Sequence, residues 1–583
     1  MDALLVDPNF GFDDSRRLTG PNRWFAGPAV VITPLGGAAR DAAAHTRWAR
    51  RVRQVCAALT WPDPAPCVQP HARQPMLIFA APQDLLFTAT EINEWAWERC
   101  AAEAGFDDVA GFDLAQDLGD DLATVGAVFA QRAADEQRPA LAALRAEAAA
   151  RGLPLLEDDE EVSIGAGTGS RVWPLDELPA VVDVPWADLH DVPTALVTGS
   201  NGKTTTVRLL AAMARAAGLA AGHCSTEGVA VAGQAIERGD YAGPAGARVV
   251  LRHRQVQAAI LETARGGLLR RGLAVQRADV AVVTNISPDH LGEYGVESAD
   301  DLAEVKLIVA RALAGSGTLV LNADDAMLMA AARRLPHAAS ARQALFAMDH
   351  DDAALAALRH TGGSSCGVRE GRLLLSHEGR EHDLGDITAM PLTLGGAAAH
   401  NVQNMAAAAL AAACLGLPVA AIAATLQTFG ARPQDNAGRL ERRMWRGATV
   451  LIDYAHNPAG LAQLLHVARA LRPARLGLLI GQAGNRDDAA IAELCRAAMH
   501  SAPDRVVVKE LPLMLRGRAP GEVPSLIERE LLAAGLPRDA LVHEDDEEAA
   551  AHELLAWAQP GDVIVLPLHT RAVRERVAAT LEA

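Results

Sequence analysis

One glycine-rich run, residues 198–206 (Thr-Gly-Ser-Asn-Gly-Lys-Thr-Thr-Thr), constrains the fold of this sequence more than any other feature. An apolar stretch at residues 195–197 leads into it, and an Ala/Leu/Arg-rich segment follows it and stops at Gly218. Strand, glycine loop and helix in this order are typical of a phosphate-binding loop, because the backbone N–H groups and the positive helix N-terminus both face the anion. The sequence therefore predicts a nucleotide-binding domain with a parallel α/β sheet.

The residues of this loop have separate predicted roles. Lys203 is expected to reach the β- and γ-phosphates of a nucleotide, and the Thr204 hydroxyl to bind Mg²⁺. The first glycine, Gly199, stands three residues before Gly202, whereas the usual loop has a glycine where this sequence has Val197. A glycine turn that merely precedes a helix is the alternative. The residues expected to hold the nucleotide are Gly199, Ser200, Asn201, Gly202, Lys203, Thr204 and Thr205.

Length and composition set the broad class of protein. At 583 residues the chain is too long for one ordinary core, so several domains are expected. The formal net charge of −18 disfavours a nucleic acid as partner. The seven cysteines form no CxxC pair, which indicates reduced thiols in a cytoplasmic protein.

Two further observations argue against export and against a membrane. The first residues have neither the basic segment nor the apolar core of a signal peptide. The uncharged stretch 405–429 is long enough to span a bilayer, but Gly416-Leu-Pro418 interrupts it. We therefore expect two helices of a soluble domain there.

Short apolar stretches alternate with helical segments from about residue 194 onward, which predicts two α/β domains. The expected organisation is an α+β N-terminal domain at 1–160, a connector at 161–193, a central ATP-binding domain at 194–436 and a Rossmann-like C-terminal domain at 437–583. Residues 362–395 are expected to form a small β insertion in the central domain. The expected strands are 195–198, 258–261, 280–284, 318–321, 449–452, 476–480, 505–508 and 563–566.

The N-terminal third carries three local predictions. Thr88-Ala-Thr-Glu91 has the spacing of a capping box, so a helix is expected to begin near Thr88. Residues 133–151 are expected to form one exposed helix, and the acidic run 157–161 a solvated turn.

Polar residues follow two of the expected strands in the central domain. Glu262 ends one of them, and Asp289 and His290 follow another. Open α/β sheets bind their ligands at the carboxyl ends of the strands, where such side chains hold metal or orient a ligand. A helix cap or a surface charge is the alternative for each residue taken alone.

The order of these motifs resembles the Mur ligase superfamily. The shared features are Gly-Ser-Asn-Gly-Lys-Thr-Thr, the strand that ends at Glu262, Thr-Asn-Ile-x-x-Asp-His-Leu at 284–291, and a lysine at Lys306. Three later segments fit as well: His400-Asn-x-x-Asn404, Gly438-Arg439-Leu-Glu441 and Asp453-Tyr454-Ala-His456-Asn457-Pro.

Within that superfamily the sequence is most similar to the Mur-like half of the cyanophycin synthetases. The motifs that carry this similarity are Glu262-Thr-Ala-Arg-Gly-Gly-Leu-Leu-Arg-Arg-Gly-Leu273, Asp289-His-Leu-Gly292, Arg516-Gly-Arg518 and, near the N-terminus, Arg16-Arg-Leu-Thr-Gly-Pro-Asn22. Those synthetases carry an ATP-grasp domain before their Mur-like half, and only about forty residues separate Arg151 from the phosphate loop here, too few for that fold. One departure from related ligases is Asn485, which stands where they carry the aspartate of a Gly-Asp-Arg turn.

The resemblance implies an ATP-dependent amide ligase that works through an acyl phosphate with Mg²⁺. It assigns metal binding to Thr204, Glu262 and His290, and places Lys306 as a carbamylated lysine beside the second metal; an exposed helix lysine is the alternative. Asn404 and Tyr454 are implied to contact adenine, Asp453 the ribose, and Arg439 the γ-phosphate after domain closure. The implied catalytic residues are Lys203, Glu262, His290, Lys306 and Arg439.

The implied substrates are an amino acid such as arginine and an aspartate-type carboxylate in a cyanophycin-like peptide. Homo-oligomerisation or association with a cyanophycin synthetase is possible. The alternatives are a catalytically idle partner or regulator of a full-length synthetase and, less in keeping with the motifs of the last domain, a nucleotide-driven switch or transporter ATPase.

Overall fold

The computed structural model describes residues 12–35, 37–71, 74–103, 118–119, 121–289 and 291–582. The chain divides into two compact units. The first comprises residues 1–199, 218–321 and 325–343, and the second residues 200–217, 322–324 and 344–583. The predicted domain boundaries at 160, 193 and 436 stay predictions.

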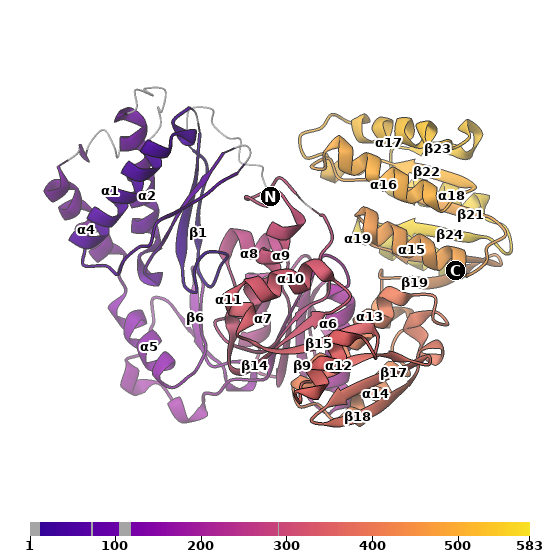
Figure 1. The fold of residues 1–583 in the computed structure, drawn as a ribbon, viewed down its shortest axis with the longest axis horizontal. Helices are drawn as coiled ribbons and strands as arrows, with labels where there is room; N and C mark the ends of the chain where they lie inside the picture. The colour runs from indigo at the N-terminus through magenta and orange to yellow at the C-terminus, as the bar shows by residue number, and fades with distance from the viewer. Residues whose placement is uncertain are drawn as a thin grey trace. The chain divides into compact units, whose positions relative to one another are not determined.

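The first unit begins with an antiparallel sheet in the order β1-β2-β4-β3 (Figure 1). Three helices cover one face of it, and their contact with the sheet buries Trp48, Trp95 and Trp97. The strands are β1 (Phe12–Leu18), β2 (Ala29–Pro34), β3 (Cys67–Gln69) and β4 (Met76–Ala80), and the helices are α1 (Ala42–Ala58), α2 (Leu86–Glu103) and α4 (Leu122–Glu136). The predicted α+β character of this part is confirmed.

The predicted helix near Thr88 is present, but its predicted capping box is wrong, and so is the single helix predicted at 133–151. Helix α2 begins at Leu86, so Thr88 lies inside its first turn; the N–H groups of Phe87 and Thr88 instead donate to the Glu136 carboxylate, each at 2.8 Å. The helix expected at 133–151 is two helices, because Pro139 opens α5 (Pro139–Ala150) after α4 has ended.

A small three-stranded antiparallel sheet follows, formed by β5 (Leu155–Glu157), β6 (Glu161–Ile164) and β7 (Arg171–Pro174). The predicted acidic turn lies between β5 and β6. It is not merely solvated, because Asp158 Oδ2 accepts a hydrogen bond of 2.5 Å from Arg252.

The larger sheet of the first unit has the order β11-β10-β9-β12-β8-β13-β14. Five of these strands are parallel, and β10 and β11 form an antiparallel hairpin at the edge. The strands are β8 (Thr194–Thr198), β9 (Ala221–Ser225), β10 (Gly228–Val231), β11 (Gln234–Arg238), β12 (Ala258–Glu262), β13 (Ala278–Val283) and β14 (Leu313–Asn322). The helices are α7 (Pro244–Arg252), α8 (Arg265–Arg271), α9 (Ala299–Leu307), α10 (Ala326–Arg334) and α11 (Pro336–Ala339).

The second unit contains the helix that follows the glycine loop, α6 (Lys203–Ala216), which packs against α13 and α14. Gly416 has a φ of +79° and separates α13 from α14, as predicted for this uncharged stretch. Within the described residues no helix is long and apolar enough to cross a membrane. The neighbouring elements are β15 (Arg342–Asp349), α12 (Ala353–His360), β16 (Ser365–Arg369), β17 (Arg372–His377), β18 (Arg380–Asp386), α13 (Ala399–Cys414) and α14 (Val419–Leu426).

The remainder of the second unit is a six-stranded sheet in the order β19-β20-β24-β21-β22-β23, parallel except for β19 (Figure 1). The strands are β19 (Glu441–Trp445), β20 (Ala448–Asp453), β21 (Leu476–Ile480), β22 (Arg505–Lys509), β23 (Leu541–Glu544) and β24 (Val563–Pro567). The helices are α15 (Pro458–Ala470), α16 (Asp488–His500), α17 (Glu522–Ala533), α18 (Glu547–Trp557) and α19 (Arg571–Glu582). All eight strands predicted in the two α/β regions are present within a few residues of their expected bounds.

Candidate functional site

Three neighbouring strands of the first unit end at the same edge of their sheet. Glu262 is the last residue of β12 and is paired in register with Val197 of β8, while Thr198 of β8 is paired with Val283 of β13. The carboxyl ends of parallel strands are where open α/β sheets hold their ligands. The structure thus brings the Glu262 carboxylate, which is only 1% exposed, next to the start of the glycine loop.

Gly199 is required at the start of that loop by its own conformation and by its neighbour. Its φ is +148°, and a Cβ atom there would lie 1.8 Å from Thr284 Oγ1. The Thr284 backbone N–H donates to the Thr198 carbonyl at 3.0 Å, which fixes the two strand ends. A residue with a side chain cannot occupy this position without separating them.

Gly202, in the second unit, must also be a glycine. Its φ is +84°, and a Cβ atom would lie 2.1 Å from Asn404 Oδ1. Asn404 is buried on α13, and its Nδ2 donates to Asn401 Oδ1 at 3.1 Å. The structure therefore places Asn404 against the loop; its predicted contact with adenine stays a prediction.

The residues after Gly202 begin helix α6. Lys203 is its first residue, and its Nζ donates to the Ser200 carbonyl at 3.1 Å, which holds the ammonium group over the loop. Ser200, Thr204 and Thr205 are nearly buried. The N-terminus of a helix carries unpaired N–H groups and a partial positive charge, so this loop has the features of an anion site.

The segment after β20 contacts the same loop within the second unit. Asn457 caps helix α15, where its Oδ1 accepts from Gly460 N at 2.8 Å, and its Nδ2 donates to Asn201 Oδ1 at 3.1 Å. Asp453, predicted to bind the ribose, accepts a hydrogen bond of 2.5 Å from the Leu440 N–H. A direct hydrogen bond thus joins the glycine loop to the segment that bears Asp453 and Tyr454.

Tyr454 lies among two arginine and two histidine side chains. The Arg439 guanidinium is 4.4 Å from the centre of its ring and the Arg574 guanidinium 5.2 Å, while the His456 and His569 rings are 5.4 and 5.5 Å away. A guanidinium over an aromatic ring is attracted by the ring quadrupole. Arg439, predicted to reach a γ-phosphate after closure, is therefore held beside Tyr454 in this structure.

Residues 436 and 437, which precede the Gly438-Arg439 motif, are hydrogen-bonded to helix α6. Asn436 Nδ2 donates to Thr205 Oγ1 at 3.3 Å, and the Arg208 guanidinium donates to the Ala437 carbonyl at 2.9 Å. Sequence reasoning missed Asn436, although it lies two residues before the Gly438-Arg439 motif. It also missed Arg574, for which the helical pattern of α19 gives no signal.

A buried charge network lies behind Tyr454 and was also missed. Lys509, which has no exposed surface, donates from Nζ to Glu547 Oε1 at 2.5 Å and to the Pro567 carbonyl. Glu547 accepts from the N–H groups of His569 and Thr570, and His569 Nε2 lies 3.2 Å from the Ala455 carbonyl. Lys509 at the end of the apolar run Val506-Val-Val508 was the only sequence signal, since a charge that continues a buried strand needs a partner.

The burial of this network shifts the pKa of each group. Burial lowers the pKa of Lys509, with Glu547 opposing the shift, and burial lowers the pKa of His569 well below its usual value, with Lys509 adding to it. Burial raises the pKa of Glu547, but the Lys509 ammonium and the hydrogen bonds that the carboxylate accepts from Lys509 and Thr570 outweigh it and bring that pKa down to about 2. We therefore take Lys509 and Glu547 as a charged pair and His569 as neutral.

The remaining predicted site residues lie in the first unit. Lys306 is on α9 and is only 3% exposed, so the exposed-lysine alternative is wrong; its carbamylation stays a prediction. Asp289 is half-buried after β13. His290 lies outside the described residues, so its predicted role as a metal ligand stays a prediction. Asn485 follows Gly484, and Gly484 packs closely against the segment at Leu515, since a Cβ atom on it would lie 1.9 Å from the Leu515 carbonyl oxygen.

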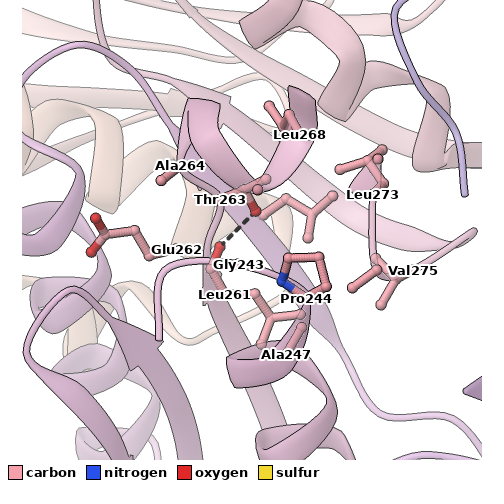
Figure 2. A pocket seen from close by; sticks show the side chains of 14 residues that line it. Gly243, Pro244, Ala247, Leu261, Glu262, Thr263, Ala264, Leu268, Leu273 and Val275 are labelled. Carbon is pink, nitrogen blue, oxygen red and sulfur yellow. Dashed lines mark hydrogen bonds between the residues drawn. The ribbon is translucent and has the colours of Figure 1, made fainter. Parts of the chain in front are cut away.

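A small pocket lies beside Glu262 in the first unit (Figure 2). Its walls are mostly apolar and include Pro244, Leu268 and Val275. Thr263 Oγ1 is occupied by a hydrogen bond to the Leu261 carbonyl at 3.3 Å. Figure 2 shows the Glu262 carboxylate directed away from these apolar residues, so the pocket lies behind the carboxylate.

Each unit, taken by itself, contains residues of the kinds that bind a nucleotide or a divalent metal. The two glycines let the loop backbone lie close to Thr284 and Asn404, where a Cβ atom would collide, and a glycine backbone of this kind turns its N–H groups toward an anion. At the start of α13, His400 Nδ1 is buried and has no hydrogen-bond partner within the described residues, as expected beside an absent polar ligand. The Thr204 hydroxyl and the Glu262 carboxylate are oxygen donors of the kind Mg²⁺ prefers. No group of three or more His, Cys, Asp or Glu side chains gathers as a metal cluster in the described part of the chain.

Comparison with known proteins agrees with this organisation. Residues 197–412 match the family model of the Mur ligase middle domain. Residues 438–567 match the model of the Mur ligase glutamate ligase domain. The two matches follow each other in chain order and contain the glycine loop and the segment after β20, respectively.

Individual relatives are similar over much of the chain. A cyanophycin synthetase from Synechocystis sp. is 34% identical over 415 residues, which cover 70% of this chain and 47% of that protein. A UDP-N-acetylmuramoyl-L-alanyl-D-glutamate–2,6-diaminopimelate ligase from Xanthomonas campestris pv. campestris is 30% identical over 381 residues, which cover 64% of this chain and 70% of that protein. The chain thus spans about half the length of the cyanophycin synthetases that it matches.

Among solved structures, E. coli FolC in complex with ADP is 19% identical with a TM-score of 0.47, covering 67% of this chain and 90% of that one. Two family models in chain order and a match over more than two thirds of a diaminopimelate ligase lead to one conclusion: this chain belongs to the Mur ligase family.

Proposed function

We propose that this protein is an ATP-dependent carboxylate–amine ligase that forms an amide or isopeptide bond. The observation that carries the proposal is the hydrogen bond between Asn201 and Asn457, which joins an intact phosphate-type loop to the Asp453–Asn457 segment. Joining a carboxylate to an amine is uphill in water, so the reaction needs both a nucleotide and a second surface that closes over the activated carboxylate.

The proposed reaction balances as follows. A carboxylate oxygen attacks the γ-phosphorus of ATP, the bond to the β-phosphate oxygen breaks, and ADP leaves. A neutral amine then attacks the carbonyl carbon of the acyl phosphate, inorganic phosphate leaves, and the amine releases one proton. The products are the amide, ADP and phosphate.

In this scheme the protein positions groups and neutralises charge. Lys203 would neutralise the transferred phosphoryl group, and Arg439 would do so after moving away from Tyr454. Thr204 and Glu262 would hold Mg²⁺, with His290 as ligand of a second ion, and the metal would supply neutralisation of the phosphate oxygens. The Asp453 and Tyr454 side chains would hold the ribose and the adenine.

For the substrates we propose an amino acid such as arginine as the amine and an aspartate-type carboxylate in a cyanophycin-like peptide. The support is the 34% identity to cyanophycin synthetases over the ligase region. The alternative, an idle partner or regulator of a full-length synthetase, has one observation in its favour: residues 155–174 form only the small sheet β5-β6-β7 where those synthetases carry an ATP-grasp domain.

A coupled ADP-release assay separates the two proposals. Each amino acid is supplied in turn as the amine. The carboxylate is a β-aspartyl-arginine peptide that ends in an aspartate with a free side-chain carboxylate, free aspartate or free glutamate. We expect ADP release that depends on both substrates, with the largest rate for arginine and the peptide, and a product heavier by one arginine minus water in mass spectrometry. If no pair raises ADP release above background, the partner role gains over the ligase.

Gly202→Ala is expected to weaken ATP binding about tenfold or more. The new Cβ must displace Asn404. The alanine must also keep the left-handed backbone conformation, which costs roughly 1–2 kcal/mol in a residue that is not glycine. Isothermal titration with ATP measures the affinity. Gly371→Ala is the matched control, because Gly371 has a similar φ of +75° but nothing within 4 Å of its missing Cβ. An affinity for ATP that is unchanged in Gly202→Ala would contradict a phosphate role for this loop.

A further inference from the structure

The N-terminal motif Arg16-Arg-Leu-Thr-Gly-Pro-Asn22 has no part in the proposed chemistry. It nevertheless contacts the C-terminal end of helix α8, 252 residues further along the chain. The Thr19 N–H donates to the Arg271 carbonyl and the Leu273 N–H to the Pro21 carbonyl, each at 2.8 Å. A Cβ atom on Gly20 would lie 2.1 Å from the Leu273 carbonyl oxygen. A backbone seam therefore joins this motif to the end of helix α8, and only glycine fits in its middle.

Asn22 gives the segment after this seam its shape. Its side chain is fully buried, and its Nδ2 donates to the Gly27 carbonyl at 2.8 Å. Its Oδ1 accepts from the N–H groups of Trp24 and Phe25, each at 3.0 Å. The buried Asn22 side-chain amide thus holds the turn of residues 22–27 in place, and Arg23 lies in this turn.

Arg23 connects three points of the segment that leads from Asp289 to Lys306. Its guanidinium donates to the Gly295 carbonyl at 3.0 Å, to Asp301 at 2.5 Å and to Glu304 at 2.7 Å. Its side chain is only 7% exposed, so these charge-assisted hydrogen bonds are shielded from water.

Two of these hydrogen bonds are accepted by carboxylates in the first turns of helix α9, those of Asp301 and Glu304. Asp301 also closes a capping box with Ser298 at the helix N-terminus. Glu304 lies two residues before the buried Lys306 on the same helix. Arg23 therefore ties the start of α9 to the loop that precedes it.

Arg16 contacts that loop at a second place. It is buried, its Nε donates to the Leu269 carbonyl at 3.1 Å, and its guanidinium lies 5.0 Å from the centre of the Tyr294 ring. From helix α8, Arg270 donates to the Tyr294 hydroxyl at 3.1 Å. Tyr294 has a φ of +53°, an uncommon conformation for a residue with a side chain, so the loop needs outside contacts to hold this shape.

We propose that Arg16 and Arg23 are positioning residues that make the N-terminal domain a clamp on residues 285–306. This segment contains His290, the ligand of the second metal in the proposed function, and Lys306, which the family resemblance places beside that metal. The kinetic part of this inference rests on the proposed function. The clamp gives the N-terminal domain a role within the ligase reaction itself, and that role needs no neighbouring ATP-grasp domain.

Hydrogen–deuterium exchange on the full chain tests the clamp without any activity. In Arg23→Ala, amides of residues 284–307 are expected to exchange about tenfold faster or more, because three charge-assisted hydrogen bonds are lost. Amides of the last sheet, β20 to β24, should exchange at the wild-type rate. Arg53→Ala is the matched control, since Arg53 is an exposed arginine of the same domain and its Nε lies 4.0 Å from the exposed Asp63 carboxylate.

Kinetics provide the second readout. Arg23→Ala should raise the Mg²⁺ concentration for half-maximal ADP release several-fold and lower kcat, while KM for ATP changes little, because the glycine loop is untouched. Arg23→Lys keeps the charge but cannot span Gly295, Asp301 and Glu304 together, so it should show the same changes to a smaller extent.

The outcomes are distinct. Wild-type exchange at 284–307 in Arg23→Ala overturns the clamp. If Arg23→Ala loosens the whole N-terminal domain, the folded Arg23→Lys variant is used for the test in its place. Exchange at the wild-type rate in residues 284–307 of Arg23→Lys, together with an unchanged Mg²⁺ requirement, likewise overturns the clamp. A wild-type chain that releases no ADP contradicts the proposed function instead, and the exchange result then decides the clamp alone.

Discussion

Replacing Lys203 with alanine should lower substrate-dependent ADP release by about 10²- to 10³-fold, the usual loss when one preorganised charge is removed from a transition state. Lys203 is the first residue of α6, and its Nζ lies 3.1 Å from the Ser200 carbonyl, so the ammonium is held over the loop before any substrate arrives. Its loss removes the fixed positive charge nearest to the expected phosphoryl group.

The assay compares steady-state ADP release for the wild type, Lys203→Ala and Arg215→Ala. Arg215 is an exposed basic residue in the last turn of the same helix, so its replacement controls for loss of charge on α6 without a change at the loop. Thermal melting should be similar for all three. ADP release by Lys203→Ala within fivefold of the wild type would exclude the proposed role of this lysine.

Glu547→Ala should destabilise the last sheet by about 3–5 kcal/mol, the range found when one partner of a buried ion pair is removed. The change leaves the Lys509 ammonium, which has no exposed surface, with only the Pro567 carbonyl as a named partner. It also removes the acceptor of the His569 and Thr570 N–H groups, which open helix α19. Both losses leave buried polar groups unsatisfied, which costs more than the pair itself contributed.

Hydrogen exchange of the β22 and β24 amides gives the local free energy of opening for this sheet. Glu548→Ala is the control, because Glu548 pairs with Arg576 at the surface, where an ion pair contributes at most about 1 kcal/mol. Lys509→Met combined with Glu547→Gln should regain much of the loss, since the amide oxygen still accepts one of the two N–H groups and no unpaired charge remains. A Glu547→Ala effect as small as that of Glu548→Ala would show that Lys509 is not charged in the folded protein.

The local pattern of the sequence was sufficient for most elements of the two α/β regions. Apolar runs such as 476–480 became strands because they are buried on both faces of a parallel sheet, where a continuous run is stable. The glycine loop was also predictable, because the φ of +84° at Gly202 favours glycine in any context. The capping box at Thr88 failed because Glu136, 48 residues away, binds the first N–H groups of α2 in its place.

The parts of the candidate site that sequence reasoning missed depend on distant partners. Lys509 finds Glu547 across 38 residues, and nothing near Glu547 distinguishes it from an ordinary first-turn acid. Arg23 finds Gly295, Asp301 and Glu304 at separations of 272, 278 and 281 residues. Periodicity and propensity describe only the nearest turns of the chain, so they carry no information on such pairs.

The sequence by itself determined the Mur-ligase type of α/β fold, the glycine loop and the strand-end carboxylate Glu262, because each follows from backbone conformation or from the burial of a short run. Only the tertiary structure decided what surrounds them. It placed Asn404 under Gly202, Asn457 on Asn201 and Arg439 on Tyr454, and it used the Arg16–Asn22 motif as a seam against α8. The physical reason is the same in each case: a polar group that folding removes from water, in the backbone or in a side chain, must find a partner, and the fold, rather than the neighbouring residues, supplies it.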